Sequence, residues 1–389
     1  MASQPPSSEV ASTSSTYKPR YIDIGINLAD PIFRGMHNGK QRHPDDLEAV
    51  VSRAKEVGCT KLLVTGSDFA SNRDALKLAE QFREYNYTSS IFSSEYHGPS
   101  RRSSDAGTEA AAGHSTPCDP DPSAPLPDSH LPDPTKSASI IVRLTDAIKS
   151  AQSSSPGRLA AFGEFGLDYD RLHYCSKNVQ LHSFAAQLEV AASLEPQLPL
   201  FLHSRAAHDD FVRLLKDAFG PRLEGLRTGG VVHSFTGSAE EARELMDLGL
   251  YIGINGCSFK TAENCAVVKE VALDRIMLET DGPWCEVRPS HEGYKYLIEK
   301  KDSSQTEGQQ QGQQKKKNQK KEPDVPERFK VVKKEKWVEG AMIKGRNEPC
   351  SIERVAKIVA AIKGVTVEDV CEAAWRNTIK VFGLGEQVA

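Results

Sequence analysis

The feature that most constrains the fold of this chain is a regular alternation of short apolar runs with amphipathic stretches. Eight runs have the length and apolar content expected of strands. They cover residues 21–28, 61–67, 88–94, 158–166, 198–204, 229–235, 250–256 and 275–280. Most are almost continuously apolar, as is typical of parallel strands that are buried on both faces, whereas the run at 88–94 is largely polar and is the weakest of the eight.

Stretches with helical periodicity separate these runs. Within residues 45–57, apolar side chains from Leu47 to Val57 fall on one helical face, and Gly58 provides a stop signal. Further helices are expected at 73–85, 177–194, 207–219, 239–248, 262–271, 352–362 and 367–381. Strict alternation predicts a parallel sheet, and eight repeats favour an α/β fold closed into a (β/α)8 TIM barrel over an open doubly wound sheet. The first strand lacks a following Gly-x-Gly-x-x-Gly, which argues against dinucleotide binding.

Three stretches differ in composition from the rest. Residues 1–19 form a tail rich in Ser, Pro and Thr, and residues 99–135 and 301–334 are polar insertions. Such segments bury too little apolar surface to offset their ordering entropy, so we expect them to be disordered. The prediction is one barrel domain over 20–385, interrupted twice. The lysines of residues 301–321 would contact a phosphate backbone or act as a nuclear localisation signal, but a solvated loop is the favoured interpretation.

Composition limits the partners and the compartment. The net charge of -4 excludes a global basic field, so a nucleic-acid substrate has to be argued from local chemistry. Eight scattered cysteines without a Cys-x-x-Cys pair indicate reduced intracellular thiols. Residues 1–16 lack both an apolar segment and Arg, and the chain has no long apolar run. We therefore expect a cytoplasmic protein, with the nucleus as a second location, no membrane association and no obligate protein partner.

Polar residues with metal-binding chemistry occur within or just after the expected strands: Asp23, Asn27, Glu164, His203, His233 and Asp281. In a barrel, the carboxyl ends of all strands face one mouth, so these residues would converge there. Two imidazoles and several carboxylates suit Zn²⁺, Mn²⁺ or a similar divalent cation. Glu164 would bridge two ions about 3.5–4 Å apart, the spacing that clamps the attacking and leaving oxygens of a displacement.

A single histidine at a strand end is more often a structural polar residue than a ligand. Four such residues at the ends of four strands on one face favour a shared centre. Small residues also flank the ligands, as Gly163 and Gly166 flank Glu164 and Gly282 follows Asp281, and they allow close backbone approach.

Seven motifs in this order resemble the TatD family of metal-dependent deoxyribonucleases, and most closely its eukaryotic branch. They are "YIDIGINL", "GEFGLDYDRL", "PLFLHSR", "VVHSFTG", "LYIGINGCSFKT", "LETDGPWCEV" and "KGRNEPC". The resemblance covers about residues 20–85, 155–300 and 335–385, which is most of the chain outside the insertions. Each motif alone is modest, but seven in the right order are highly specific.

The resemblance implies a barrel of the metallo-dependent hydrolase type that cleaves DNA phosphodiester bonds, as an exonuclease on single strands. DNA is favoured as the substrate, and RNA stays open. It implies that Glu164, His203, His233 and Asp281 form the metal site, with Glu164 and Asp281 catalytic and Asp281 accepting a proton from the attacking water. Two divalent ions, Mg²⁺, Mn²⁺ or Zn²⁺, are the expected cofactors.

The chain departs from the family pattern at two places. Many relatives carry His-x-His in the first strand, where this chain has Asp23 and Asn27, so one ion would be held loosely. Relatives also place Gly-x-His-Pro after the third strand, and here His97 in "YHGP" is the near match. Either His97 takes the metal-binding role in a rearranged loop, or this function is lost, or the gene model is wrong at this segment.

Arg205 and Arg346 are candidate phosphate contacts, because a guanidinium fork matches phosphate oxygens, but structural ion pairs are an equal alternative. Asn347 and Glu348 are expected to fix the last loop. Trp284 would stack on a base or act as a rim aromatic.

Two other functions stay open at this point. The same ligand set would polarise the carbonyl of an amide, ester or lactone, because barrels host many chemistries. The atypical third strand and the lysine-rich insertion would also fit a non-catalytic nucleic-acid-binding protein, which would bind DNA without metal and without turnover.

Overall fold

The eight expected strands form one parallel sheet in chain order. A computed structural model describes residues 17–66, 68–82, 88–91, 123–155, 157–298 and 325–384 of the protein. The strands are β1 (Tyr21–Ile26), β4 (Cys59–Val64), β5 (Thr88–Ile91), β6 (Leu159–Asp168), β7 (Leu200–Arg205), β8 (Gly230–Val232), β9 (Tyr251–Ile254) and β10 (Ile276–Leu278). Ile26 pairs in parallel with Gly282, and the Asp281 N–H donates to the Gly25 carbonyl, which closes the sheet between its first and last strands. The predicted (β/α)8 barrel is confirmed.

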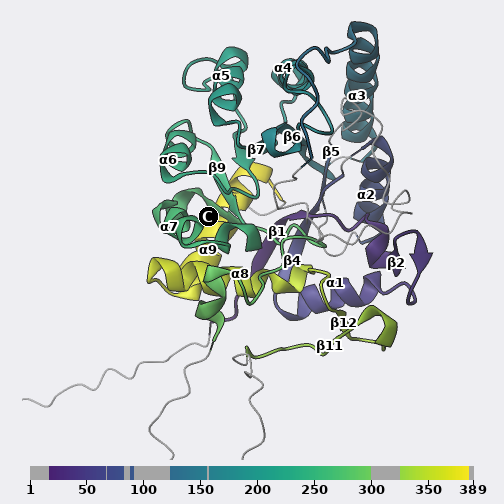
Figure 1. The fold of residues 1–389 in the computed structure, drawn as a ribbon, viewed down its shortest axis with the longest axis vertical. Coiled ribbons are helices and arrows are strands. Elements are labelled where there is room, and N and C mark those ends of the chain that lie inside the picture. The colour runs from purple at the N-terminus through teal and green to yellow at the C-terminus, as the bar shows by residue number, and fades with distance from the viewer. Residues whose placement is uncertain are drawn as a thin grey trace, which may run out of the picture.

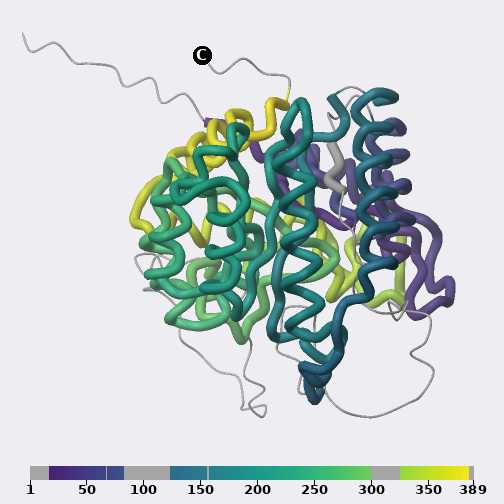
Figure 2. The backbone as a smooth tube through the Cα atoms, turned by 90° about the horizontal axis from the view of Figure 1, so that it is seen from above, coloured from purple at the N-terminus to yellow at the C-terminus, as the bar shows by residue number. Residues whose placement is uncertain are grey.

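Helices surround this sheet (Figure 1). They are α1 (Leu47–Glu56), α2 (Phe69–Gln81), α3 (Pro134–Ser154), α4 (Lys177–Ser193), α5 (His208–Phe219), α6 (Ala239–Asp247), α7 (Ala262–Glu270), α8 (Ile352–Lys363) and α9 (Val367–Phe382). Figure 2 shows several of them side by side on the outside of the barrel. Their starts follow local signals, since Ser238 and Thr366 each form a capping box with the third residue of α6 and α9. Among the described residues, no helix is long and apolar enough to cross a membrane.

Helix α3 was not expected from the sequence. It begins at Pro134, inside the predicted insertion 99–135, and it buries Ile140, Leu144 and Ile148 at helical spacing. The preceding residues 123–133 are also anchored, because the Ser176 hydroxyl donates to the His130 carbonyl. The insertion therefore ends earlier than predicted; residues 99–122 lie outside the described residues.

The second insertion also ends before its predicted boundary. The short strand β11 (Val331–Val332) pairs in parallel with β12 (Met342–Ile343), and η9 (Lys334–Lys336) lies between them. A separate hairpin, β2 (Met36–His37) with β3 (Lys40–Gln41), follows β1. Both small sheets belong to loops that leave the carboxyl ends of barrel strands, which is where a barrel places its functional site.

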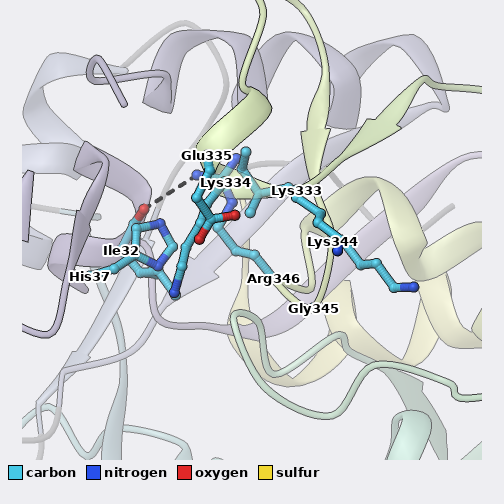
Figure 3. Close-up of a pocket in the computed structure, with 9 residues that line it drawn as sticks. Ile32, His37, Lys333, Lys334, Glu335, Lys344, Gly345 and Arg346 are labelled. Carbon is cyan, nitrogen blue, oxygen red and sulfur yellow. Dashed lines mark hydrogen bonds between the residues drawn. The ribbon is translucent and has the colours of Figure 1, made fainter. Parts of the chain in front are cut away.

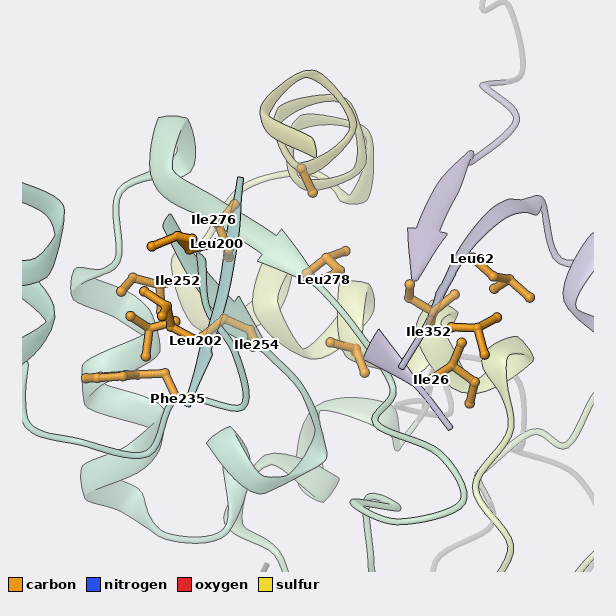
Figure 4. Close-up of a cluster of buried hydrophobic side chains, with 14 of the residues drawn as sticks. Ile26, Leu62, Leu200, Leu202, Phe235, Ile252, Ile254, Ile276, Leu278 and Ile352 are labelled. Atoms are coloured by element: carbon orange, nitrogen blue, oxygen red, sulfur yellow. The ribbon is translucent and has the colours of Figure 1, made fainter. Parts of the chain in front are cut away.

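The core has two parts. Between strands and helices, side chains such as Leu202, Ile254 and Leu278 form a large apolar layer (Figure 4). A smaller cluster contains alternate residues of the strands, among them Phe201, Val231 and Met277, together with apolar residues of α9. Successive residues of a strand point to opposite faces. Residues two positions after Phe201, Val231 and Met277 therefore point to the same face as these three, nearer the carboxyl ends of the strands.

Candidate metal centre

The alternation of strand faces delivers polar side chains to one point. Counting two residues onward from Phe201, Val231 and Met277 gives His203, His233 and Glu279. These residues follow the last apolar layer of β7, β8 and β10. On this face each strand is apolar until it ends, and the next residue on the same face is polar. This change from apolar to polar residues places the side chains of the site.

Glu164, His203 and His233 form a compact triangle of possible ligand atoms. His233 Nε2 lies 2.7 Å from Glu164 Oε1 and 3.1 Å from His203 Nδ1, and His203 Nδ1 lies 3.3 Å from Glu164 Oε1. Ligands bonded to one ion at about 2.1 Å lie about 3.0 Å apart at right angles and about 3.4 Å apart in a tetrahedron. The three atoms thus fit one divalent cation. Among the described residues, Glu164, His203 and His233 form the group whose ligand atoms are spaced as in a metal site.

The electrostatics of this triangle favour positive charge. Burial alone would lower the pKa of His203, but its hydrogen bonds with Asp168 and Glu164 raise it. Burial also opposes charge on His233, yet the Glu164 and Glu279 carboxylates hold its pKa well above the usual value. The pKa of Glu164 is lowered, although burial works against this, because His233 and His203 stabilise its charged form. The acidic groups would therefore attract a cation.

Close backbone approach helps to form the site. A Cβ on Gly166 would lie 1.8 Å from the His203 carbonyl oxygen, so no other residue fits between β6 and β7 at this point. This confirms the expectation that a small residue beside Glu164 allows the backbones of two strands to approach closely.

Asp168 was missed by the sequence analysis. Strand β6 continues two residues beyond the expected end at Gly166, and Asp168 Oδ2 then lies 3.3 Å from His203 Nε2. His203 is thus held by carboxylates at both ring nitrogens. The signal was available, because in a continuing strand Asp168 lies on the same face as Gly166.

Glu279 was also missed, because it precedes the more conspicuous Asp281. Its carboxylate is fully buried, and Oε1 accepts hydrogen bonds from the Ser234 N–H and the Asn255 side chain. Its Oε2 lies 3.6 Å from His233 Nδ1, and neither atom has a hydrogen-bond partner in the described part of the chain. A carboxylate facing the outer nitrogen of a ligating histidine is the usual means of fixing the ring orientation.

Asp281 lies beside the triangle and is not one of its three members. It adopts a left-handed backbone conformation with φ 51°, and its Oδ1 accepts from Asn27 Nδ2 at 3.2 Å. Its Oδ2 lies 3.1 Å from the Cys285 sulfur. Burial raises its pKa to about 7; the charge of His233 lowers it, whereas Glu279 and Glu164 raise it. Asn27, predicted as a possible ligand, therefore positions Asp281.

Asp23 also differs from its predicted role as a ligand. Its side chain is fully buried, and its two oxygens accept hydrogen bonds from the backbone N–H and the hydroxyl of Thr280 and from the Gly25 N–H. Burial raises the pKa of Asp23 to about 8. The carboxyl thus joins β1 to the segment after β10, where it supports Asp281 from behind.

The two candidate phosphate-binding arginines are both buried. Arg346 is 1% exposed and pairs with Asp46 at 2.7 Å and with Glu348 at 2.9 Å, which is the ion-pair alternative. Burial would raise the pKa of Asp168, but the His203 hydrogen bond and the charge of Arg205 lower it, so Arg205 lies near the centre.

The remaining sequence predictions concern the rim of the site. Asn347 Nδ2 donates to the Thr280 carbonyl at 2.8 Å, so it fixes the last loop as expected. Trp284 is 37% exposed and is available for stacking. His97 and residues 301–321 lie outside the described residues, so their predicted roles stay predictions.

A barrel that gathers two imidazoles and several carboxylates at the carboxyl ends of its strands defines a metal-dependent hydrolase with a divalent-metal site. A family model described as "TatD related DNase" matches residues 22–383. The chain belongs to this family, which confirms the family predicted from the seven motifs.

Relatives match over nearly the whole chain. The chain is 39% identical over 363 residues to the "Deoxyribonuclease Tat-D" of Schizosaccharomyces pombe, covering 93% of this chain and 96% of the relative. It is 27% identical to the "3'-5' ssDNA/RNA exonuclease TatD" of Erwinia amylovora, with 93% and 100% covered. Its structure is similar to that of an "uncharacterized amidohydrolase" from Saccharomyces cerevisiae, with TM-score 0.72, 31% identity, and 94% and 100% covered.

Proposed function

We propose that the protein is a metal-dependent deoxyribonuclease that hydrolyses phosphodiester bonds, acting as an exonuclease on single strands and also accepting RNA. The observation that carries this proposal is the ligand triangle of Glu164, His203 and His233 at the mouth of a TatD-family barrel. The names of the fission-yeast and Erwinia relatives support the substrate class.

We propose two divalent ions, Mg²⁺, Mn²⁺ or Zn²⁺, as cofactors. The triangle would hold one of them, and Glu164 and Asp281 would hold the other. Such ions supply Lewis-acid polarisation of the phosphoryl oxygen and lower the pKa of bound water. The Glu164 side chain is 26% exposed, so an ion would reach it from solvent.

The protein's own residues orient the reactants. Asp281 would take the proton of the attacking water on its carboxylate, which Asn27 Nδ2 holds in place. Glu279 would keep the proton of His233 on Nδ1, so that the Nε2 lone pair faces the centre. Trp284, at the rim, would stack on a base of a single strand.

A second candidate is hydrolysis of an amide or ester, because the yeast structure that resembles this chain is described as an amidohydrolase. The same cluster would serve either reaction, since a polarised carbonyl and a polarised phosphoryl group need similar ligands. The choice between them rests on substrate.

The test is an assay of labelled single-stranded DNA, RNA and p-nitrophenyl acetate with Mg²⁺, Mn²⁺ or Zn²⁺, and with EDTA as the metal-free control. We expect metal-dependent shortening of the DNA, and a loss on the order of 10³-fold in Glu164→Ala and His203→Ala. Glu189→Ala, an exposed position on α4, is the matched control. Full activity in either site variant, or turnover of the ester but not of DNA, would contradict the proposal.

A further inference from the structure

A cavity of about 280 Å³ lies between the loop after β1 and the loop after β10. Its lining consists of Ile32, His37, Lys333, Lys334, Glu335, Ile343, Lys344, Gly345 and Arg346. Figure 3 shows Ile32 and His37 on one side of it and Lys333 and Lys344 on the other. Both loops leave the carboxyl ends of barrel strands, so this basic pocket belongs to the same face as the metal centre.

The pocket carries positive charge that the described structure does not neutralise. The ammonium groups of Lys333, Lys334 and Lys344 form no ion pair in the described part of the chain, and Glu335 is the acid among the lining residues. Since Arg346 is neutralised by Asp46 and Glu348, the three lysines and Glu335 leave a balance of +2. The whole chain, by contrast, has a net charge of -4. A local positive region on an acidic protein attracts anions.

The wall of the pocket contains a donor without a partner. Arg346 is almost fully buried, and its terminal nitrogens donate to Asp46, Glu348 and the Ile32 carbonyl. Its Nε, however, has no partner among the described residues. That nitrogen is itself buried, so Arg346 forms part of the wall, and the three lysines provide the charge that a ligand can reach.

His37 reports the same positive field. Its pKa is lowered to about 4, first by burial and then by the charges of Lys334, His43, Arg346 and Arg42. The N–H of this neutral ring is used within the wall: His37 Nε2 lies 3.2 Å from His43 Nε2, and His43 Nδ1 donates to the Pro44 carbonyl. The cavity is slightly smaller than pockets for drug-sized ligands, which begin at about 300 Å³, so it suits a single anionic group.

The pocket is connected to the metal centre through few residues. Asn347 follows Arg346 in the wall, and its side chain donates to the Thr280 carbonyl at 2.8 Å, next to Asp281. The Asn347 N–H also donates to the Pro283 carbonyl at 3.0 Å. With consecutive Cα atoms 3.8 Å apart, the wall lies on the order of 10 Å from Asp281.

We propose that this basic pocket binds a backbone phosphate of the nucleic-acid strand whose scissile bond lies at the metal centre. The inference rests on the proposed function and names a second contact for its substrate. A phosphate held away from the reacting bond positions the strand without reading its sequence. It also explains how an acidic protein would retain a polyanion.

The test compares two triple variants with the same change in charge. Lys333→Ala/Lys334→Ala/Lys344→Ala alters the pocket, and Lys149→Ala/Lys357→Ala/Lys380→Ala removes three lysines from α3, α8 and α9. Binding of a fluorescein-labelled single-stranded oligodeoxynucleotide is measured by anisotropy in EDTA from 25 to 300 mM KCl, and thermal unfolding confirms that both variants are folded.

We expect the pocket variant to bind about tenfold or more weakly than the control variant. Losing one phosphate contact should reduce the slope of log K against log salt by about 0.7 for a single strand. In cleavage assays with metal, the loss should fall on KM and not on kcat, because the contact is made equally in the bound and transition states.

The outcomes separate the two proposals. If the pocket variant has the same affinity and salt slope as the control variant while wild type cleaves the oligonucleotide, the pocket assignment is wrong and the proposed function stands. If wild type does not cleave but the pocket variant loses binding, the proposed function is wrong and the phosphate site stands. Displacement of the oligonucleotide by equimolar inorganic phosphate would assign the pocket to free phosphate and overturn the strand contact.

Discussion

Two clusters of charged side chains, one buried and one partly exposed, lie at the same face of the barrel, and their charge balance differs. Around Arg346, two arginines meet two carboxylates: Arg346 pairs with Asp46 and Glu348, and Arg53 pairs with Glu348 at 2.8 Å. This cluster is neutral without a ligand.

The metal centre is acid-rich instead. In the described part of the chain, none of Glu164, Glu279 and Asp281 forms an ion pair with Lys or Arg, and their nearest basic groups are His203 and His233. Burying unbalanced carboxylates is costly unless a cation compensates them. The difference indicates that a buried charged cluster is structural when its charges cancel and functional when they need an external partner.

The largest expected effect comes from breaking the balanced cluster. Arg346→Met keeps most of the side-chain volume but leaves two buried carboxylates with one arginine, which should cost about 3–5 kcal/mol of unfolding free energy. Urea unfolding measures it, and Arg213→Met, in an exposed pair with Asp210, should cost under about 1 kcal/mol. If Arg346→Met keeps full stability and only raises KM for DNA, Arg346 is a substrate contact after all.

The acid-rich cluster, unlike the balanced one, should gain stability when a metal ion is added. A divalent ion at 100 times its Kd should stabilise the folded protein by about 2.7 kcal/mol, because it binds only the folded state. Thermal unfolding with Mn²⁺ against EDTA measures the shift. His203→Ala should lose the shift and Glu189→Ala should keep it; an equal shift in both would place the ion elsewhere.

These two clusters differ in how far the sequence predicts them. The metal ligands follow apolar strands on a period of two, so Glu164, His203 and His233 could be placed at one mouth from the pattern alone. Arg346 has no such pattern, because its partner Asp46 is 300 residues away in another loop. Long-range pairing between loops depends on tertiary packing. The sequence therefore left Arg346 open as either a phosphate contact or a structural ion pair.

Glu279→Gln tests whether the histidine is oriented from behind. The amide can keep the oxygen that faces the Ser234 N–H, but it cannot carry the negative charge that faces His233 Nδ1. We expect metal affinity to fall by about 10–100-fold with the fold intact. Metal titration monitored by calorimetry measures this; unchanged affinity would reduce Glu279 to a backbone anchor.

The smallest expected effect concerns pH and the basic pocket. The pKa of His37 is lowered to about 4 in the folded state, chiefly by burial, whereas an unfolded histidine titrates near about 6.5. Between these values the unfolded state binds more protons, so this contribution to stability is full above about pH 6.5 and is lost as pH falls towards 4. Urea unfolding at pH 7.5, 6 and 5 should show a smaller acid loss in His37→Gln than in wild type. Parallel curves would contradict the assigned environment.

Other parts of the molecule escaped the sequence analysis for different reasons. The Ser- and Pro-rich composition before Pro134 hid the start of α3, although Ile140, Leu144 and Ile148 have helical spacing. Asp23 looked like a ligand because it lies in the first strand, but its position two residues before Gly25 does not reveal that Thr280 satisfies its carboxyl. Residue type and the alternation of side chains along a strand predict which face a side chain occupies. Its hydrogen-bond partners there depend on the tertiary structure.

The most direct test of the central claim is a crystal structure of the protein soaked in Mn²⁺, with the ion located by its anomalous scattering. The account predicts a peak about 2.0–2.3 Å from Glu164 Oε1, His203 Nδ1 and His233 Nε2. A well-ordered site with Mn²⁺ absent from this triangle, or with its peaks bound only by other residues, would contradict it.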